Sequence, residues 1–505
     1  MVSGHGSVSS RTISNARGGP PPEGGDELRP ELADVARLAR RLVRRTVSAA
    51  RAEENSIWHL LAGHLGPGVA TFPVTSGSWP QYDQVNVQAG LEAWLAEPGR
   101  THETCGLTGF HHSMFGLADL TRPGRGPHDH RGLGLGSVST DMLPCGPGGA
   151  MRPCVQCALY LVTEPGGRLV VLLRGADEHG RQEAVTVEVT CADRQQGQRV
   201  VDDIRRLAVE HNVFRGHVLA FGADVFGGRL GPARRPLLSF LDRPHVARDQ
   251  VILPAEVLGG IERQVLGVAR HASRLLASGQ HLKRGILLHG APGTGKTHTV
   301  RYLIGELDGV TVLILSGGAL RLIGEACSVA RSLQPSLIVV EDVDLIAEER
   351  TGPAGHQPLL FQLLNEMDGL GADLDVTFLL TTNRADLLEP ALAQRPGRVD
   401  HAALLPLPDA GARRRLLQLY QGNLDLDLAD PDAVIGRTEG VTASFLKELL
   451  RRAALNAADD AGTEAPLRVT GAHLSTALDE LLDTRNQLTR LLLGAPGRGP
   501  HGVDA

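Results

Sequence analysis

Residues 290–297 decide the fold of this chain, and they read Gly290-Ala291-Pro292-Gly293-Thr294-Gly295-Lys296-Thr297. This stretch fits the pattern G-x-x-x-x-G-K-[ST] at every fixed position. An apolar run over residues 285–289 precedes it, and a helix-compatible run over residues 298–307 follows it. A strand, a glycine-rich loop and a helix in this order place backbone N–H groups and a helix N-terminus around an anion. The stretch therefore predicts a phosphate-binding loop.

All eight residues of the loop are candidate nucleotide-binding residues. In such a loop the ammonium of Lys296 reaches the β- and γ-phosphates, and the hydroxyl of Thr297 binds Mg²⁺. Lys296 is one of only three lysines among the 51 basic residues of the chain. A compact ammonium fits between phosphates where a planar guanidinium would be too bulky. A lysine at this position in an arginine-rich chain thus supports the functional interpretation.

The bulk properties of the chain exclude several classes of protein. Its 505 residues are enough for about three domains, and its formal net charge of −6 does not favour a nucleic-acid partner. No apolar run approaches the roughly 18 residues of a membrane span, and the first residues lack the pattern of a signal peptide. Six cysteines do not make a disulfide framework in so long a chain. We therefore expect a cytoplasmic, reduced setting.

Composition and periodicity divide the chain into five parts. Residues 1–28 and 491–505 are predicted to be disordered tails, because glycine and proline are frequent there. Residues 29–248 carry strand and helix patterns of their own and predict a separate α+β N-terminal domain of unknown role. Strands alternate with helices over residues 251–408, which predicts an αβα sandwich with a parallel sheet. Residues 409–490 are predicted to form a helical lid.

Polar residues follow two further predicted strands. The apolar residues 337–340 are followed directly by Glu341 and Asp342, and the apolar residues 376–380 lead into Thr381-Thr382-Asn383. Carboxylates at a strand end can hold Mg²⁺ and polarise a water molecule, and a neutral amide can orient that water beside the γ-phosphate. Glu341, Asp342 and Asn383 are therefore candidate catalytic residues.

Two arginines follow on a turn that contains proline and glycine. Arg395 and Arg398 lie within Gln394-Arg395-Pro396-Gly397-Arg398. Arginines in such a place suit an arginine finger, which stabilises charge on a transferring phosphoryl group. In isolation the same stretch would be read as a surface turn with solvated arginines.

Five segments, in this order, resemble the AAA family of ATPases: residues 290–297, 335–344, 363–370, 381–390 and 395–400. The resemblance covers about residues 251–485. It implies ATP as the nucleotide and Mg²⁺ as the cofactor, with Thr297 and Glu341 as metal-binding residues. It also implies a homo-oligomeric ring, usually a hexamer, in which Arg395 and Arg398 act on the nucleotide of the neighbouring subunit.

The chain departs from the family in three respects. Most members have Asp-Glu where this chain has Glu341-Asp342, so by position Glu341 takes the Mg²⁺ role and Asp342 polarises the water. Residues 316–325 resemble the pore-loop region, and Leu322 stands where the pore aromatic is usual. No His-Glu-x-x-His motif occurs in the sequence, which argues against a zinc-dependent AAA protease.

Two hypotheses about function remain open at this point. The first is a Mg²⁺-dependent AAA ATPase that couples hydrolysis to the remodelling of an unknown protein client. The alternative is an ATP-binding assembly switch or scaffold with little turnover. A nucleic-acid motor is disfavoured by the net charge and by the family resemblance.

Two weaker patterns lie in the N-terminal half. Cys145, Cys154 and Cys157, with His128 and His130 upstream, are either a zinc site or incidental cysteines, because their spacing does not fit paired C-x₂-C knuckles. The aromatic residues Trp79, Tyr82 and Trp94 are expected in a core rather than in a ligand pocket.

Overall fold

The structure is a computed structural model, and it describes residues 57–112, 115–122, 133–176, 184–222, 238–345, 358–369, 371, 374–388, 399–427, 431–461 and 467–482. The tails predicted at residues 1–28 and 491–505 lie outside the described residues. No helix in the described ranges is long and apolar enough to cross a membrane.

The N-terminal part is built on a seven-stranded sheet whose order is β1-β7-β6-β5-β2-β3, with β4 paired to β5. Every pairing in this sheet is antiparallel. The strands are β1 (Val74–Pro80), β2 (Thr101–Thr108), β3 (Gly134–Gly136), β4 (Ser139–Pro144), β5 (Met151–Glu164), β6 (Gly167–Arg174) and β7 (Ala184–Cys191). A hairpin at residues 165–167 joins β5 to β6, and Gly167 there has a φ of 126°.

Helices cover both faces of this sheet. The helices are α2 (Ile57–Leu65), α3 (Gln84–Leu95), α4 (Leu117–Leu120) and α5 (Arg194–Glu210). Successive residues of β5 point to opposite faces, so Tyr160 packs in the core under α3 and α5, and Leu159 packs in the core under α2 and α4. Trp94 on α3 is fully buried, as expected of a core aromatic.

The second sheet is the one predicted from the phosphate loop, and its order is β14-β10-β13-β12-β11-β8-β9. All its pairings are parallel except that of β8 with β9. Its strands are β8 (Val218–Phe221), β9 (Leu238–Leu241), β10 (Arg284–His289), β11 (Thr311–Leu315), β12 (Ser336–Val340), β13 (Val376–Thr382) and β14 (His401–Leu404). The predicted fold class, an α/β fold with a parallel sheet, is confirmed.

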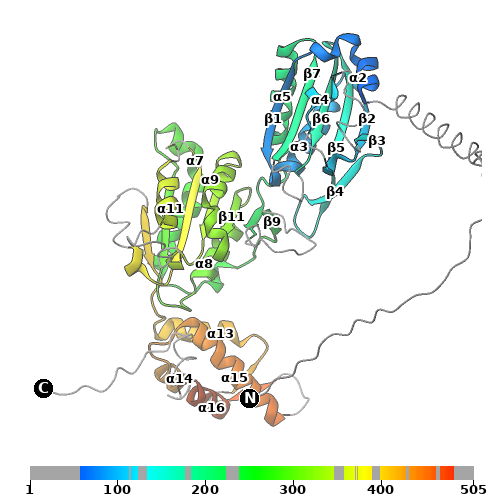
Figure 1. Ribbon diagram of the computed structural model, residues 1–505. Coiled ribbons are helices and arrows are strands. Elements are labelled where there is room, and N and C mark those ends of the chain that lie inside the picture. Colours follow the sequence, from blue (N-terminus) through cyan, green and yellow to red (C-terminus); the bar gives the residue numbers. More distant parts are fainter. Residues whose placement is uncertain are drawn as a thin grey trace, which may run out of the picture.

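Helices sandwich this sheet (Figure 1). They are α6 (Ala255–Glu262), α7 (Val268–Ala277), α8 (Lys296–Glu306), α9 (Ile323–Ser332) and α11 (Pro358–Gly369). Val339 of β12 packs with α6 and α8 on one face, whereas Val340 packs with α9 and α11 on the other. Because both faces are buried, the strands are apolar throughout rather than alternating.

The boundary predicted between the N-terminal domain and the nucleotide-binding domain, near residue 250, does not match the sheets. Strands β8 and β9 fall within the predicted N-terminal domain, yet β8 pairs with β11 and so extends the nucleotide-binding sheet. Pairing between Val218 and Val312 joins residues far apart in the chain. The prediction failed here because a short apolar strand does not indicate which sheet it joins.

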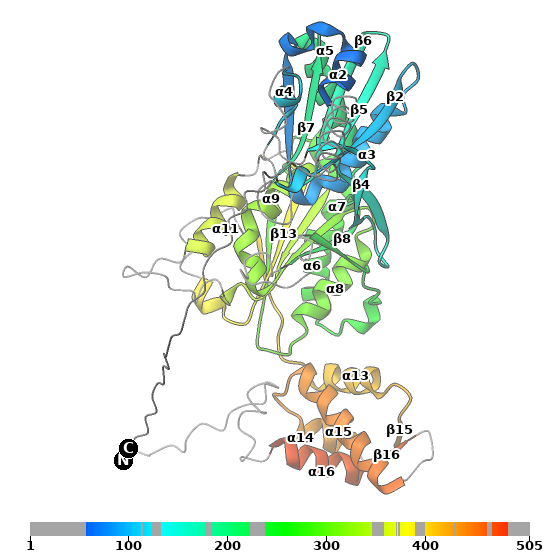
Figure 2. The ribbon, with the colours of Figure 1, turned by 45° about the vertical axis from the view of Figure 1, so that its right-hand side comes forward.

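Residues that lead into β8 connect the two parts. The backbone N–H of Val213 donates to Oδ1 of Asn86, which is fully buried on α3. Val85 and Cys154 of the N-terminal part belong to the same hydrophobic core as Phe214 and Leu219. Both ribbon views place β4 and α3 next to the strands β8 and β9 (Figures 1 and 2).

The C-terminal part is a lid with its own core (Figure 2). Its helices are α13 (Ala410–Gln421), α14 (Pro431–Arg437), α15 (Ala443–Ala461) and α16 (Gly471–Leu482). Two short parallel strands, β15 (Asp425–Asp427) and β16 (Arg468–Thr470), lie between them, so the lid is not purely helical as predicted.

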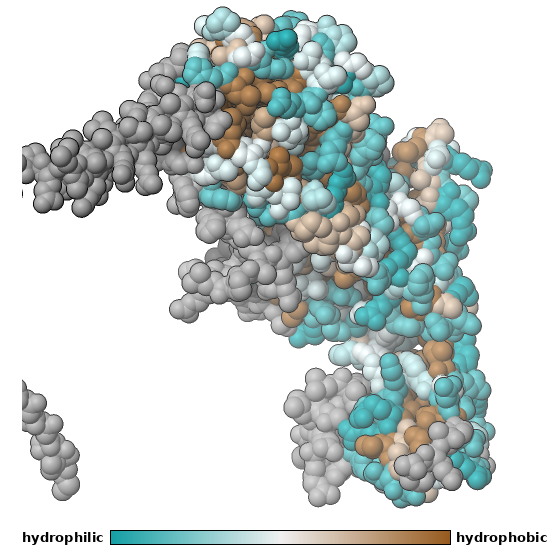
Figure 3. Space-filling view, turned by 90° about the vertical axis from the view of Figure 1, so that its right-hand side faces the viewer, coloured by the Kyte–Doolittle hydropathy of each residue, from teal (hydrophilic) through white to brown (hydrophobic). Residues whose placement is uncertain are grey.

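The hydropathy of the surface differs between the parts. On the face drawn in Figure 3, hydrophobic residues gather on the N-terminal part, beside the grey atoms, whereas the nucleotide-binding part is mostly hydrophilic. The large hydrophobic residues that are exposed in the described ranges are scattered over all three parts rather than collected at one site.

Candidate nucleotide-binding site

The phosphate loop joins the end of β10 to the start of α8, as its sequence predicts. Gly290, Gly293 and Gly295 all have positive φ values, of 150°, 81° and 99°. At Gly290 a Cβ would lie 2.5 Å from the carbonyl oxygen of Leu405, and at Gly293 it would lie 2.9 Å from side-chain atoms of the lid. Gly290 and Gly293 therefore have to be glycine both for their backbone conformation and for space. The loop forms a cradle of the kind that surrounds phosphate oxygens.

The side chain of Lys296 folds back over this cradle. It is only 7% exposed, and its Nζ donates to the carbonyl oxygens of Gly290 at 2.8 Å and of Ala291 at 3.0 Å. Burial lowers the pKa of its ammonium, and the nearby carboxylates of Asp342 and Asp344 partly oppose that shift. The charge of Lys296 is thus held inside the loop, where an anion would interact with it strongly.

Glu341 comes directly after β12 and meets the first turn of α8. Burial raises the pKa of Glu341, the adjacent Asp342 raises it further, and the nearby Thr297 side chain lowers it. A hydroxyl and a carboxylate side by side form an oxygen donor set of the kind that Mg²⁺ prefers. Thr297 and Glu341 are therefore the residues that fit a Mg²⁺ ion in this site.

Asp342 and Asn383 lie together at the ends of neighbouring strands. The side-chain amide Nδ2 of Asn383 donates to Oδ1 of Asp342 over 3.3 Å. β12 and β13 are adjacent and parallel, so their carboxyl ends meet at the same edge of the sheet. The structure thus brings together the two residues that the sequence suggested for polarising and orienting a water molecule.

Asp344 is a buried acid of this site that the sequence analysis missed. It is 8% exposed, and its Oδ1 accepts hydrogen bonds from Oγ1 of Thr382 at 2.9 Å and from the backbone N–H of Asn383 at 3.3 Å. The carboxylate thereby anchors the end of β13 that carries Asn383. A second acid two positions after Asp342 was the available signal, because alternate residues at a strand end point to the same side.

The lid touches the phosphate loop directly. Helix α15 begins at Ala443, and Thr442 and Ser444 lie against Gly293. The turn that leads into α15 is therefore in contact with the loop.

The remaining predicted residues have different outcomes. Arg395 and Arg398 lie outside the described residues. Leu322, expected in the pore-loop region, ends a short 3₁₀ helix (Gly317–Leu322) and is only 3% exposed. Leu322 packs in the same core as α9 and α11, so its side chain is not displayed on the surface where a pore aromatic would be. The segment is too short to project an apolar side chain into solvent, and burial of that side chain is favourable.

The cysteines of the N-terminal part do not gather around one point. Cys154 and Cys157, three residues apart on β5, pack in cores on opposite sides of the sheet. Burial raises the pKa of each thiol to about 12. Within the described ranges no group of three or more His, Cys, Asp or Glu side chains could hold a metal ion, and His128 and His130 lie outside those ranges.

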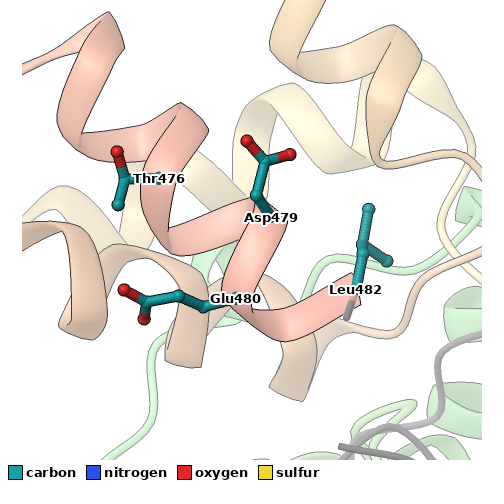
Figure 4. Close-up of a pocket in the computed structure, with 4 residues that line it drawn as sticks. All are labelled: Thr476, Asp479, Glu480 and Leu482. Atoms are coloured by element: carbon teal, nitrogen blue, oxygen red, sulfur yellow. The ribbon is translucent and has the colours of Figure 1, made fainter. Parts of the chain in front are cut away.

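One surface hollow lies on the lid and is shown in Figure 4. It is lined by Thr476, Asp479, Glu480 and Leu482, all on α16. Asp479 pairs there with Arg437. None of these residues belongs to the phosphate loop or to the acidic strand ends.

Comparison with known proteins agrees with the geometry. Residues 286–407 match the family model described as "ATPase family associated with various cellular activities (AAA)". The chain carries an AAA ATPase domain. That domain contains Lys296, Glu341, Asp342 and Asn383, and the predicted family is confirmed.

Relatives of known name match about half of this chain. The chain is 34% identical over 254 residues to the ATP-dependent zinc metalloprotease FtsH of Nitrosococcus oceani, which covers 45% of this chain and 38% of that protein. It is 31% identical over 288 residues to FtsH 3 of Sphaerobacter thermophilus, which covers 54% of this chain and 58% of the relative. The chain thus spans less than two thirds of the length of these curated relatives, and outside the AAA region its role is open.

Proposed function

We propose that this protein is a Mg²⁺-dependent ATPase that hydrolyses ATP to ADP and phosphate. One observation carries the proposal. The phosphate loop with Lys296, the Thr297–Glu341 pair and the Asp342–Asn383 pair all converge at one edge of the parallel sheet. Phosphoryl transfer depends mainly on positioning and on electrostatic stabilisation, and this edge holds the groups for both.

The residues of the loop bind the triphosphate. Backbone N–H groups of residues 290–297 and the N-terminus of α8 face the phosphate oxygens. Lys296 exchanges its two carbonyl partners in the loop for the β- and γ-phosphates. Thr297 and Glu341 would hold Mg²⁺, and the ion would supply positive charge that offsets the charge of the phosphates.

Asp342 and Asn383 act on the attacking water. Asp342 accepts a hydrogen bond from the water and takes up its proton as the water oxygen bonds to the γ-phosphorus. Asn383 orients both the water and the carboxylate through its amide. Aspartate is one methylene shorter than the glutamate usual at this position, so the water must sit closer to the strand end.

We propose that the active form is a ring of identical subunits, with Arg395 and Arg398 completing the site of the neighbour. This part rests on the family resemblance and on the order of the sequence, in which both arginines follow β13 within residues 394–398. An arginine supplied in trans raises the rate only after assembly. The rate per subunit should therefore climb with protein concentration.

We propose further that hydrolysis is coupled to the remodelling of a protein client through the N-terminal part. The N-terminal part packs directly on the AAA domain through Asn86 and Val213, so movement of one part bears on the other. Leu322 is buried. A client is therefore better handled on the surface of the N-terminal part than threaded past this residue.

An assembly switch that binds ATP with little turnover is the second candidate. The reversed order of Glu341 and Asp342 favours it, because the shorter Asp342 carboxylate must reach the water. In a switch, ATP binding alone would bring the subunits together, and the N-terminal part would act as a scaffold.

Steady-state phosphate release at several protein concentrations tests the proposal. The wild type is compared with Lys296→Ala, Asp342→Asn and Arg398→Ala. We expect a rate per subunit that rises with concentration and that each substitution removes. ATP binding without sustained release in the wild type would refute the ATPase and establish the switch. Stimulation by DNA or RNA at moderate salt would instead point to a nucleic-acid motor.

A further inference from the structure

Asp342 has an unusual backbone conformation. Its φ is 51°, and no other residue among the described ones, apart from glycines, has a positive φ. This left-handed region is costly for most side chains, although aspartate tolerates it better than most. Residues held in such a conformation cluster at functional sites, where the surrounding structure maintains them.

The neighbouring strand β13 holds this conformation in place. Oγ1 of Thr381 accepts a hydrogen bond from the backbone N–H of Asp342 at 3.1 Å. The carbonyl oxygen of Thr381 accepts a second bond, from the N–H of Val343 at 2.9 Å. One residue of β13 thus binds two successive N–H groups of the segment that carries the acid.

The hydroxyl of Thr381 forms its hydrogen bond across to Asp342, outside β13. Thr381 is 2% exposed, so its methyl group packs in the interior while its hydroxyl turns to Asp342. The next residue, Thr382, has a different task, because its hydroxyl donates to Asp344 and accepts from the N–H of Arg384. The two threonines therefore act on different acids.

We propose that Thr381 is a positioning residue that sets the direction of the Asp342 carboxylate; the proposal rests on the proposed ATPase function. Together with the Asn383 amide at 3.3 Å, Thr381 holds the residue at both its backbone and its carboxylate. The left-handed backbone redirects the Cβ of Asp342 and so compensates for the methylene that glutamate would have supplied.

Variants of Thr381 test the role of its hydroxyl. Thr381→Val keeps the shape and removes the hydroxyl, and Thr381→Ser keeps the hydroxyl. We expect Thr381→Val to bind ATP with the wild-type Kd but to lower kcat about 10- to 100-fold, the range expected when a catalytic group is displaced by about 1 Å. Thr381→Ser should restore most of kcat.

A matched control lies on the same strand. Thr377 is also buried on β13, four residues before Thr381. Its Oγ1 accepts a hydrogen bond from Arg284 at 3.3 Å, at the opposite end of the strand from Asp342. Thr377→Val should keep the wild-type kcat. The proposal fails if Thr381→Val hydrolyses ATP at the wild-type rate. It also fails if Thr381→Ser loses as much kcat as Thr381→Val, since packing rather than the hydroxyl would then be responsible.

A readout independent of turnover separates this proposal from the ATPase itself. If the wild type shows no turnover, the proposed function fails, and the role of Thr381 is decided by crystal structures of wild type and Thr381→Val. Loss of the positive φ of Asp342 in the variant would support the positioning role. An unchanged φ and an unchanged carboxylate would overturn it.

Discussion

The backbone N–H of Ser444 in the lid donates a hydrogen bond to the carbonyl oxygen of Gly293 in the phosphate loop over 3.2 Å. The lid is therefore joined to the loop at the residue where a side chain has no room. This relationship leads to the first of four predictions.

Gly293→Ala should weaken the fold and the binding of ATP. At this position φ is 81°, and a Cβ would lie 2.9 Å from side-chain atoms of Ser444 and Thr442. We expect a loss of about 1–3 kcal/mol in the free energy of unfolding, measured by denaturant titration. Gly279→Ala is the control, because Gly279 has a φ of 72° but no atom within 4 Å of a Cβ. Equal losses for the two variants would show that the lid contact adds nothing.

Lys296→Arg should fail to restore what Lys296→Ala removes. The Lys296 ammonium lies within 3.0 Å of two loop carbonyl oxygens, a space that suits a compact ammonium better than a planar guanidinium. Isothermal titration calorimetry with ATP should show at least about tenfold weaker binding for both variants, which corresponds to the loss of one charge-assisted hydrogen bond. Wild-type affinity in Lys296→Arg would contradict this account of the loop.

Arg243→Ala should destabilise the AAA domain. The guanidinium of Arg243 donates to four backbone carbonyl oxygens, those of Gly216, Ile304, Leu307 and Val310, at 2.7 to 3.0 Å. Two of these close the C-terminal end of α8, where a positive charge also offsets the helix dipole. We expect a loss of about 2–4 kcal/mol in unfolding free energy, because the carbonyls lose their partners.

A surface arginine provides the comparison for Arg243. Arg206 pairs with Asp203 and Glu210 on α5, and its side chain is 57% exposed. Arg206→Ala should cost less than about 1 kcal/mol, as is usual for exposed ion pairs. A similar cost for both variants would mean that the four carbonyl contacts of Arg243 are individually weak.

Glu448→Gln should alter the pH dependence of stability. Hydrogen bonds from Arg451 and Arg452 lower the pKa of Glu448 to about 2. The pKa of Glu448 in the folded protein lies below the ordinary value of 4.5. The ion pair therefore stabilises the lid fully above pH 4.5, and it loses its effect as the pH falls towards 2. We expect Glu448→Gln to cost up to about 1 kcal/mol at pH 7.

That cost should shrink between about pH 4.5 and pH 2 and should vanish below this range. Thermal unfolding of the wild type and the variant across this range measures it. A difference that is the same at pH 7 and at pH 3 would show that the glutamine perturbs packing rather than charge.

Much of the AAA domain could be predicted from local sequence. The spacing of Gly290, Gly295 and Lys296 specifies a strand, a loop and a helix, because the glycine conformations and the anion site are properties of a few consecutive residues. Asp342 and Asn383 were likewise predictable as neighbours, because the carboxyl ends of adjacent parallel strands meet at one edge.

Other features were decided by the tertiary structure. The addition of β8 to β11, the burial of Leu322 and the left-handed Asp342 all depend on contacts between residues distant in the chain. A short apolar segment can pair with any open strand edge, and an aspartate adopts a positive φ only where a neighbour compensates its cost. The residues of the phosphate loop could be recognised from the order of amino acids alone, since their interactions are local. The folded chain decided which sheet each strand joins and where Asp342 points, since pairing and packing are settled only when all the competing surfaces are present.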